Sequence, residues 1–402
     1  MQPDVLVEGE MHFDASGDGE EIVAHAAEQE PALRIVFVLS GLGAGGAEKV
    51  VNMLAHHRRA HGDDVHVLAV SANNAASFFA YDKAISVEAL GGGTASGAIG
   101  TARRIARLRT RLSALSPDLV VSFLTKVNIM VVLASRGLGL RLVLSERNNF
   151  STQAMSPIWR LSRPLAARAA ERLVMQTRQA TTLLPPALKD KSVIIPNPVT
   201  LRRASPAAEG DGTRVVAVGR LDRQKGFDLL IDAFATVTKL DPRLTLTIFG
   251  EGPERAALEA QVQRLGLQDR IRLPGTTKSP VEWLDAGDIF VLSSRFEGFP
   301  NVLLEAMSAG LATIAFDCPW GPSEIINTPE VGMLVPLGDI AQLTAAIRRL
   351  AGDAALRQRL GAAAARAVAA RYATSIVLQQ WDNVIAPPMT ATVRLPTEQV
   401  PT

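Results

Sequence analysis

The sequence predicts two successive α/β domains, each built on a doubly wound parallel sheet. The chain has 402 residues, of which 47% are hydrophobic, so it is long enough for two domains with full cores. Short apolar runs alternate with segments of helical period along most of its length. After a connector rich in proline and glycine near 204–212, the alternation begins again. In such sheets a ligand binds beyond the carboxyl ends of the strands, so we expect the site in a cleft between the domains.

The first domain, expected over residues 33–203, begins with a strand, a helix and a second strand. The apolar run 34–40 is followed by a glycine-rich turn and a helical pattern over 48–60. The next apolar run, 65–70, completes a β-α-β order, which implies parallel strands. Further strands are predicted at 119–123, 141–145 and 192–195.

The second domain, expected over residues 204–375, begins with a strand at 214–219 and a helix at 227–240. Its remaining strands are predicted at 244–249, 271–273, 289–292, 313–316 and 333–335. The stretch 340–385, rich in alanine and arginine, predicts long helices, and we expect residues 376–388 to pack back on the first domain. The acidic segment 1–32 and the segment 389–402, rich in proline and threonine, are expected to be disordered or loose.

Composition indicates a protein that stays on the cytoplasmic side of the membrane. The single cysteine, Cys318, cannot form an internal disulfide, and the sequence begins with acidic and polar residues, unlike a secretory signal. The chain has no uninterrupted apolar run of about 18 residues, so we expect no transmembrane helix. We expect a cytoplasmic protein that is peripheral on the inner face of the plasma membrane.

The charge is distributed unevenly along the chain. Residues 34–200 carry 21 Lys and Arg against 9 Asp and Glu, whereas residues 201–402 carry 21 against 22. A basic first half beside a neutral second half suggests that the halves meet different partners. Nucleic acid is not expected, because no interleaved aromatic side chains accompany the basic region.

The segment 101–115 predicts a basic amphipathic helix in the first domain. Ile105, Leu108, Leu112 and Leu115 recur at helical spacing opposite five arginines. Such a helix can lie on an anionic membrane surface, which is the contact we expect. A surface helix that covers its own core has the same pattern. Further basic side chains in this half are Arg160, Arg163, Arg168 and Arg172, near Trp159.

A glycine-rich turn at residues 41–46 follows the first strand and satisfies G-x-G-x-x-G. A dinucleotide site would also need an acidic residue at the end of the second strand, and residues 69–74 contain none. A nicotinamide or flavin cofactor is therefore not expected. We favour a backbone cradle for phosphate or sugar hydroxyls over a plain tight turn.

Two loops of the second domain offer cations and close backbone approach. Arg220 and Lys225 lie between a strand end and a helix start, which suits a diphosphate, although a solvated charged loop has the same composition. Residues 250–254, Gly-Glu-Gly-Pro-Glu, form a tight turn at the next strand end.

Two carboxylates, Glu297 and Glu305, lie eight positions apart across a strand end, a loop and a new helix. Asn301 is predicted to cap that helix and Gly310 to end it. The helix start favours phosphate oxygens, and both carboxylates can accept hydrogen bonds from hydroxyls of one ligand.

Four motifs, in this order and spacing, together resemble the family 4 glycosyltransferases. They are residues 43–48, residues 219–226, residues 250–253 and the pair Glu297 and Glu305, within a resemblance over about 34–385. The family implies the GT-B fold, with two Rossmann-like domains that face each other across a cleft. It also implies an acceptor site in the first domain, a nucleotide-sugar site in the second, retention of anomeric configuration, and no metal or other cofactor.

The resemblance also implies residue roles. Arg220 and Lys225 would neutralise the diphosphate leaving group, and Glu305 would hold the ribose hydroxyls. Glu297 would position the donor sugar, since no protein nucleophile is generally identified in this family. The other donor-side residues implied are Gly45, Gly46, Gly219, Gly250, Gly252, Gly298, Phe299, Pro300 and Asn301.

The chain departs from the family at one place. Many relatives have a histidine after the fourth strand, but residues 122–128 contain none, and we expect Thr125, Lys126 or Asn128 to supply its polar contact. Residues 145–149 and 317–324 resemble a bacterial branch that builds exopolysaccharide and amylovoran repeat units. Residues 317–322 could face the sugar or form only a turn. The acceptor-side candidates are Lys126, Asn128, Glu146 and Arg147.

These observations together predict a retaining hexosyltransferase of bacterial surface polysaccharide assembly. The donor would be a nucleotide-sugar, with a UDP-sugar favoured and GDP-mannose as the alternative. The acceptor would be a lipid-linked saccharide. Two other possibilities remain open, namely a hydrolase or epimerase of the same fold and an inactive sugar-nucleotide-binding protein at the membrane.

Overall fold

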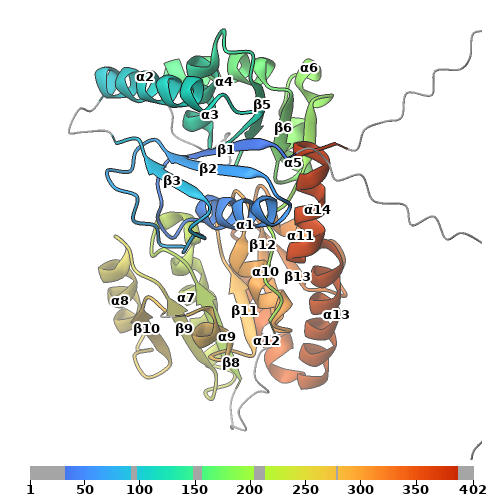
Figure 1. Cartoon of the computed structure of the whole chain (residues 1–402). Coiled ribbons are helices and arrows are strands. Elements are labelled where there is room, and N and C mark those ends of the chain that lie inside the picture. Colours follow the sequence, from blue (N-terminus) through green and yellow to red (C-terminus); the bar gives the residue numbers. More distant parts are fainter. Residues whose placement is uncertain (1–31, 92–96, 148–155, 203–212, 278, 388–402) are drawn as a thin grey trace, which may run out of the picture. The chain divides into compact units, whose positions relative to one another are not determined.

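The computed structural model describes residues 32–387 except 92–96, 148–155, 203–212 and 278 (Figure 1). The described residues from Leu33 onward belong to one compact unit. The connector expected near 204–212 and, apart from Ala32, the expected tails 1–32 and 389–402 lie outside the described residues.

The first domain contains a seven-stranded sheet whose strand pairings are all parallel. Its strands are β1 (Arg34–Leu39), β2 (Asp64–Ala69), β3 (Ser86–Ala89), β4 (Leu119–Phe123), β5 (Arg141–Ser145), β6 (Arg172–Met175) and β7 (Ser192–Ile194). They are ordered β3-β2-β1-β4-β5-β6-β7. The apolar side chains of β1 and β4 are fully buried, as expected for strands covered by helices on both faces.

Helices cover both faces of this sheet. They are α1 (Gly46–Ala60), α2 (Gly97–Leu115), α3 (Thr125–Ser135), α4 (Pro157–Ala169), α5 (Arg178–Thr182) and α6 (Pro186–Lys189). Apolar residues of α1 pack into the core on one face, and those of α2, α3 and α4 pack into the core on the other.

The second domain contains a six-stranded sheet, again with only parallel pairings. Its strands are β8 (Arg214–Val218), β9 (Thr245–Phe249), β10 (Ile271–Gly275), β11 (Ile289–Leu292), β12 (Ala312–Asp317) and β13 (Met333–Pro336), ordered β10-β9-β8-β11-β12-β13. Its helices are the 3₁₀ turn η1 (Arg223–Lys225), α7 (Phe227–Thr238), α8 (Arg255–Arg264), α9 (Pro280–Leu284), α10 (Asn301–Ser308), α11 (Pro322–Ile325), α12 (Ile340–Gly352) and α13 (Ala354–Tyr372).

The last helix, α14 (Thr374–Ile385), returns to the first domain (Figure 1). Val377, Trp381 and Ile385 are fully buried in the core that α1 covers. The crossing is fixed by an isolated parallel bridge between Val199 and Ala373. The first domain therefore contains a segment from the C-terminal part of the described chain.

In both sheets the strand order reverses direction beside the first strand of the domain, between β1 and β4 and between β8 and β11. Loops that leave adjacent strands at such a switch point diverge to opposite faces of the sheet and open a crevice. The predicted pair of doubly wound parallel sheets is confirmed. Two strands, β3 and β6, were not predicted.

The basic helix predicted over 101–115 lies within α2, and its apolar face is used inside its own domain. Leu108 and Leu112 are fully buried in the core, and Ile105 and Leu115 pack against it. Its arginines also make local bonds, since Arg107 donates to the carbonyl of Leu90 at 3.0 Å. The apolar face of α2 is therefore explained by the alternative interpretation, in which a surface helix covers the core of its own domain. No helix in the described segments is long and apolar enough to cross a bilayer.

Candidate active site

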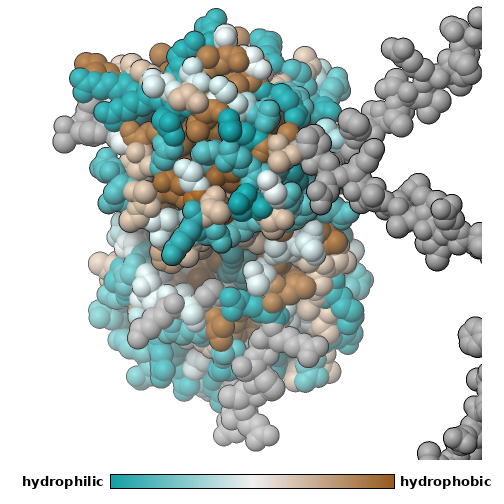
Figure 2. Space-filling model, viewed as in Figure 1, coloured by the Kyte–Doolittle hydropathy of each residue, from teal (hydrophilic) through white to brown (hydrophobic). Residues whose placement is uncertain are grey.

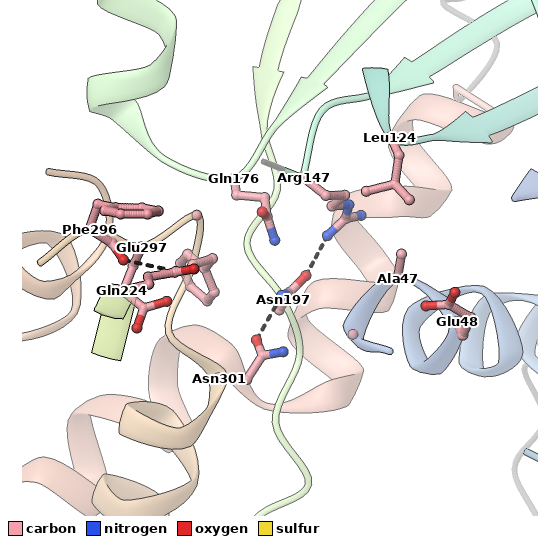
Figure 3. Close-up of a pocket in the computed structure, with 13 residues that line it drawn as sticks. Ala47, Glu48, Leu124, Arg147, Gln176, Asn197, Gln224, Phe296, Glu297 and Asn301 are labelled. Carbon is pink, nitrogen blue, oxygen red and sulfur yellow. Dashed lines mark hydrogen bonds between the residues drawn. The ribbon is translucent and has the colours of Figure 1, made fainter. Parts of the chain in front are cut away.

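A cavity of about 420 Å³ lies between the two domains, at the carboxyl ends of their strands (Figure 3). From the first domain it is lined by the start of α1 and by residues that follow β4, β5 and β6. From the second it is lined by η1 and by the loop between β11 and α10. The lining residues are Gly46, Ala47, Glu48, Leu124, Arg147, Gln176, Asn197, Gln224, Phe296, Glu297, Gly298, Phe299 and Asn301.

Glu297, which lines the cavity, forms an ion pair with Lys225. Lys225 Nζ lies 2.7 Å from Glu297 Oε1, and the hydroxyl of Ser294 donates to the same oxygen at 2.6 Å. Glu297 is only 5% exposed, so its charge depends on these two donors. The structure thus brings two of the predicted catalytic residues into direct contact.

Gly219 makes room for the stem of Lys225. A Cβ atom at this position would lie 3.1 Å from Lys225 Cε and 3.2 Å from Cδ and Cγ. The turn at Gly250 also has no room for a side chain, since a Cβ at this residue would lie 1.8 Å from the carbonyl oxygen of Gly219. At Gly252 a Cβ would lie 2.3 Å from the carbonyl oxygen of Leu221. These glycines therefore serve close backbone packing beneath Lys225.

Arg220 lies apart from Lys225. Its side chain is 71% exposed and pairs with Asp222 at 2.6 Å, and it does not line the cavity. Asp222 also caps η1 by accepting from the backbone N–H of Lys225. Neither predicted cation is among the residues that line the cavity, but Lys225 contacts Glu297, which does line it.

The helix α10 begins differently from the prediction. The N-cap is Pro300, and Asn301 is the first helical residue, so the prediction that Asn301 caps the helix was wrong. Its side chain instead bonds across the cleft, where Asn301 Oδ1 accepts from Asn197 Nδ2 at 2.7 Å (Figure 3). A Cβ at Gly46 would lie 2.9 Å from Asn301 Nδ2, which explains a glycine at the start of α1. Gly310, predicted to end the helix, follows the C-cap Ala309 with a φ of 82°.

Glu305 faces the first domain. Its Oε1 lies 3.5 Å from Lys49 Nζ on α1, and its side chain is 18% exposed. Glu305 is not among the residues that line the cavity, although it lies one helical turn beyond Asn301, which does line it. Glu305 and Glu297 therefore each have a lysine partner.

Arg147 is the one arginine that lines the cavity, and it is buried. Its Nε donates to Ser145 Oγ at 2.8 Å, and its Nη1 donates to Asn197 Oδ1. Its guanidinium lies over Phe123, 5.0 Å from the ring centroid, and 5.6 Å from the ring centroid of Trp381. Within the described chain Nη2 has no hydrogen-bond partner, and burial lowers the pKa of Arg147 to about 9. An anionic group in the cavity would stabilise this cation.

The side chains of Thr125, Lys126 and Asn128, which were expected to supply a polar contact at the site, do not line the cavity. Thr125 Oγ1 donates to Glu146 Oε2 at 2.6 Å, and Asn128 Nδ2 donates to Glu146 Oε1 at 3.0 Å. Burial raises the pKa of Glu146. Glu146 and Asn128 line a separate cavity under α4, while Lys126 is exposed. The residue of this loop that lines the catalytic cavity is Leu124, which has a φ of 78°, a strained backbone conformation for a residue with a side chain.

The segment 317–324 forms a contact between the domains. Both carboxylate oxygens of Glu324 accept from the backbone at the start of α5, from the N–H groups of Arg178 and Gln179, each at 2.8 Å. Trp320 packs with Met175 and Ala180 of the first domain. The carbonyl of Pro319 accepts from the backbone N–H of Glu297 at 3.3 Å, so this segment also supports the loop between β11 and α10.

The sequence prediction missed several residues that line the cavity, namely Glu48, Leu124, Gln176, Asn197, Gln224 and Phe296. Its position after a predicted strand could have indicated Leu124, and Asn197 stands between Pro196 and Pro198. Gln176 could not be found in this way, because β6 itself was not predicted.

A possible metal-binding group lies on α1 and α14, outside the cavity lining. His57, His61 and Asp382 could each offer one ligand atom. Asp382 is already shared, since His57 Nε2 lies 2.8 Å from its Oδ2 and Arg58 Nη1 donates to its Oδ1 at 2.9 Å. These contacts account for the group as ion pairs that hold α14 on α1.

Comparisons with known proteins agree with this arrangement. Residues 45–198 match the glycosyl transferase 4-like domain, and residues 212–353 match glycosyl transferases group 1. The amylovoran biosynthesis glycosyltransferase AmsD of Erwinia amylovora is 24% identical over 360 residues, covering 88% of this chain and 99% of that protein. An exopolysaccharide phosphotransferase of Streptomyces coelicolor is 35% identical over 224 residues, which cover 55% of this chain. The match spans only 24% of that longer protein.

Among solved structures, Anabaena HepE in complex with UDP is similar with a TM-score of 0.73 and 21% sequence identity. The similarity covers 88% of this chain and 99% of that one. The two domains and the cleft site define a glycosyltransferase of the GT-B fold. The chain belongs to glycosyltransferase family 4, and its relatives include an exopolysaccharide phosphotransferase and an amylovoran biosynthesis glycosyltransferase. The predicted family, fold and enzyme class are confirmed.

Proposed function

We propose that this enzyme transfers a hexose from a UDP-sugar to a lipid-linked saccharide, with retention of anomeric configuration, at the inner face of the membrane. The observation that carries the proposal is the Lys225–Glu297 pair, 2.7 Å apart, at the cleft between two switch points. The UDP that the similar HepE structure contains supports the choice of base. The polysaccharide enzymes among the relatives support the acceptor class.

The reaction needs stabilisation of charge on a leaving diphosphate. The acceptor hydroxyl oxygen forms a bond to the anomeric carbon, and the bond from that carbon to the diphosphate oxygen breaks with its electron pair. The hydroxyl proton passes to the departing diphosphate, so no protein nucleophile is required. Lys225, whose stem packs on Gly219, would offer ammonium N–H groups to this charge, and the start of α10 would offer backbone N–H groups.

Glu297 has two tasks in this scheme. It fixes Lys225, and its remaining lone pairs can accept from hydroxyls of the donor sugar. Glu305 and Lys49 would separate to let Glu305 accept from the ribose, because a weak contact of 3.5 Å costs little to exchange. We propose that Arg220 leaves Asp222 in the same way, since a largely exposed arginine can change rotamer freely.

A thermal-shift series tests the donor. UDP and UDP-sugars should raise the midpoint of the wild-type protein in a concentration-dependent way, while GDP-sugars should not. A shift with GDP-mannose alone would replace the proposed donor by the alternative one. Transfer to a lipid-linked saccharide from membrane extract is then measured with the preferred donor, with and without added acceptor. Donor breakdown that does not depend on acceptor would contradict transfer and indicate a hydrolase.

A further inference from the structure

Three side chains of metal-ligating type meet where the end of α1 contacts α14. His57 lies in the last turn of α1, and His61 is the C-cap residue of that helix, so the two share one face. Their ring centroids are 4.4 Å apart. Asp382 approaches from α14, and one ligand atom from each of the three side chains lies within 4.8 Å of the other two. Two imidazoles and one carboxylate are a ligand set that Zn²⁺ takes in tetrahedral sites, with water as the fourth ligand.

The hydrogen bonds of the three side chains leave ligand atoms for a cation. Nδ1 of His61 donates to the backbone carbonyl of His57 at 2.8 Å, which leaves the lone pair of Nε2 for a metal ion. His61 is exposed, so an ion can enter from solvent. Nε2 of His57 lies 2.8 Å from Oδ2 of Asp382. An ion in place of the proton between these two atoms would widen their separation to about 3.3 Å, because each metal–ligand bond is about 2.0–2.1 Å long.

The charges around the group also favour a cation. Arg58 is shared by two carboxylates, since its Nε donates to Asp63 Oδ2 at 2.6 Å and its Nη1 donates to Asp382 Oδ1 at 2.9 Å. Two carboxylates against one guanidinium leave one negative charge in this network, which a proton on His57 or a bound cation balances. The C-terminal end of a helix adds to the attraction of positive charge. Arg58 would then orient Asp382 from outside the metal site, as hydrogen bonds to metal ligands commonly do.

The group is remote from the catalytic cavity. That cavity is lined by Gly46, Ala47 and Glu48 at the start of α1, whereas His57 and His61 lie at the other end of the helix. At 1.5 Å per residue, the distance along the helix is roughly 13 Å or more. Figure 2 shows mainly hydrophilic and neutral surface where α1 approaches α14 in the same view as Figure 1. An ion held there would act on the contact between the two helices and would not touch the substrate.

We propose that His57, His61 and Asp382 bind one Zn²⁺ ion, which fastens α14 to α1 without taking part in transfer. The pair of His57 and Asp382 that holds the helices together is the metal-free form of the same contact. Two imidazole nitrogens select a transition-metal ion over Mg²⁺, which prefers oxygen ligands. The inference does not rest on the proposed function, because zinc binding needs neither donor nor acceptor.

The test is equilibrium dialysis of the full-length protein against micromolar zinc chloride, with metal analysis and a thermal-shift measurement on each sample. The wild-type protein should hold about one Zn²⁺ ion per chain more than His61→Ala, and saturating zinc should raise its thermal midpoint by at least about 2 °C. Mg²⁺ at the same concentration should leave the midpoint unchanged. His61→Ala should lose the zinc-dependent rise and keep its metal-free midpoint, because the side chain is exposed. The matched control is Arg59→Ala, an exposed residue at the same end of α1, which should bind zinc as the wild type does.

Cobalt provides a second measurement that stability alone does not change. Co²⁺ in a tetrahedral site absorbs visible light, so the wild-type protein should show this absorption and His61→Ala should lack it. Equal zinc content and equal midpoints in wild type and His61→Ala would overturn the proposal and indicate adventitious binding elsewhere on the chain. Zinc binding that depends on His61 in a protein without transferase activity would support the site and contradict the proposed function.

Discussion

Glu297, 5% exposed, is held by Lys225 at 2.7 Å, and the stem of that lysine lies directly over Gly219. Two loops, the one between β8 and α7 that contains η1 and the one between β11 and α10, are therefore coupled through one ion pair. A ligand that draws Lys225 toward a diphosphate would leave Glu297 with Ser294 as its remaining donor. Donor hydroxyls could then complete its hydrogen bonding, which links sugar recognition to diphosphate binding.

Removal of Lys225 should be costly to the unliganded protein. Lys225→Met leaves a buried carboxylate without its cation, and we expect a loss of about 3 kcal/mol in unfolding free energy and at least about a hundredfold loss of transfer. The thermal midpoint should fall by roughly 6–12 °C. Both are measured on purified protein.

The double variant Lys225→Met with Glu297→Gln separates stability from catalysis. It removes both charges, so most of the lost stability should return, while transfer stays as low as in the single variant. A double variant as unstable as Lys225→Met would mean that packing of the lysine stem, and not the ion pair, is what matters at this position.

Gly219→Ala tests whether donor binding requires the space that Gly219 leaves for the side chain of Lys225. The added methyl would lie 3.1 Å from Lys225 Cε, so the side chain must shift by a few tenths of an ångström. We expect donor affinity to fall about tenfold with little change in stability. Gly352→Ala is the control, since nothing lies within 4 Å of a Cβ there. Equal donor affinity in both variants would contradict the role given to Gly219.

Arg220 and Arg243 form a matched pair for the question of diphosphate contact. Both pair with an aspartate two positions away, Asp222 and Asp241, and their side chains are 71% and 69% exposed. Exposed pairs of this kind contribute about 0–1 kcal/mol, so neither Arg→Ala change should alter stability measurably. Arg220→Ala should weaken UDP binding about tenfold or more, whereas Arg243→Ala should leave it unchanged. Unchanged UDP binding by Arg220→Ala would remove Arg220 from the site.

Most of the fold could be predicted because buried parallel strands are continuous apolar runs. The predicted runs 119–123 and 141–145 coincide with β4 and β5. In contrast, β3 is a half-buried edge strand containing Ser86 and Glu88, and its composition resembles that of a loop. The short strand β6, from Arg172 to Met175, has only three apolar residues.

Only the parts of the candidate site that are formed by residues close together in the sequence could be predicted. The loop from Glu297 to Asn301 carries its own turn and helix start, so its place at a strand end followed from the pattern. The setting of Arg147 depends on Trp381, more than 200 positions later, and on Asn197 in the linker. No pattern near Arg147 indicates that its guanidinium is buried with no carboxylate partner among the described residues.

Cys318 provides a measure of the charge on Glu297. Burial, and after it the nearby carboxylate of Glu297, together raise the pKa of its thiol to about 12. The folded protein therefore keeps this proton over a range where the unfolded chain, with a thiol pKa near 9, releases it. This contribution to stability is complete below pH 9 and is lost as the pH rises toward 12.

The rate of alkylation of Cys318 in the native protein should be very low at pH 8, because the thiolate is the reactive form. Glu297→Gln removes the carboxylate that raises the pKa of the thiol. The variant should therefore have a lower thiol pKa and a higher alkylation rate. Cys318 is the sole cysteine of the chain, so mass spectrometry reports it without interference. An alkylation rate that is the same in Glu297→Gln and wild type would show that the carboxylate does not act on Cys318.

Arg147 should show a conflict between stability and activity. Its pKa falls to about 9 because the guanidinium is buried, so at pH 7 the folded protein holds a charge at a cost. In the unfolded chain the arginine keeps its higher, ordinary pKa and binds this proton more strongly, so this cost is fully present below pH 9 and declines as the pH rises above 9. Arg147→Met keeps the stem against Phe123 and removes the charge. We expect a thermal midpoint at pH 7 no lower than that of wild type, together with at least about a tenfold loss of transfer. A variant that is less stable yet fully active would assign Arg147 to holding the cleft together, through Asn197, and not to binding an anionic substrate.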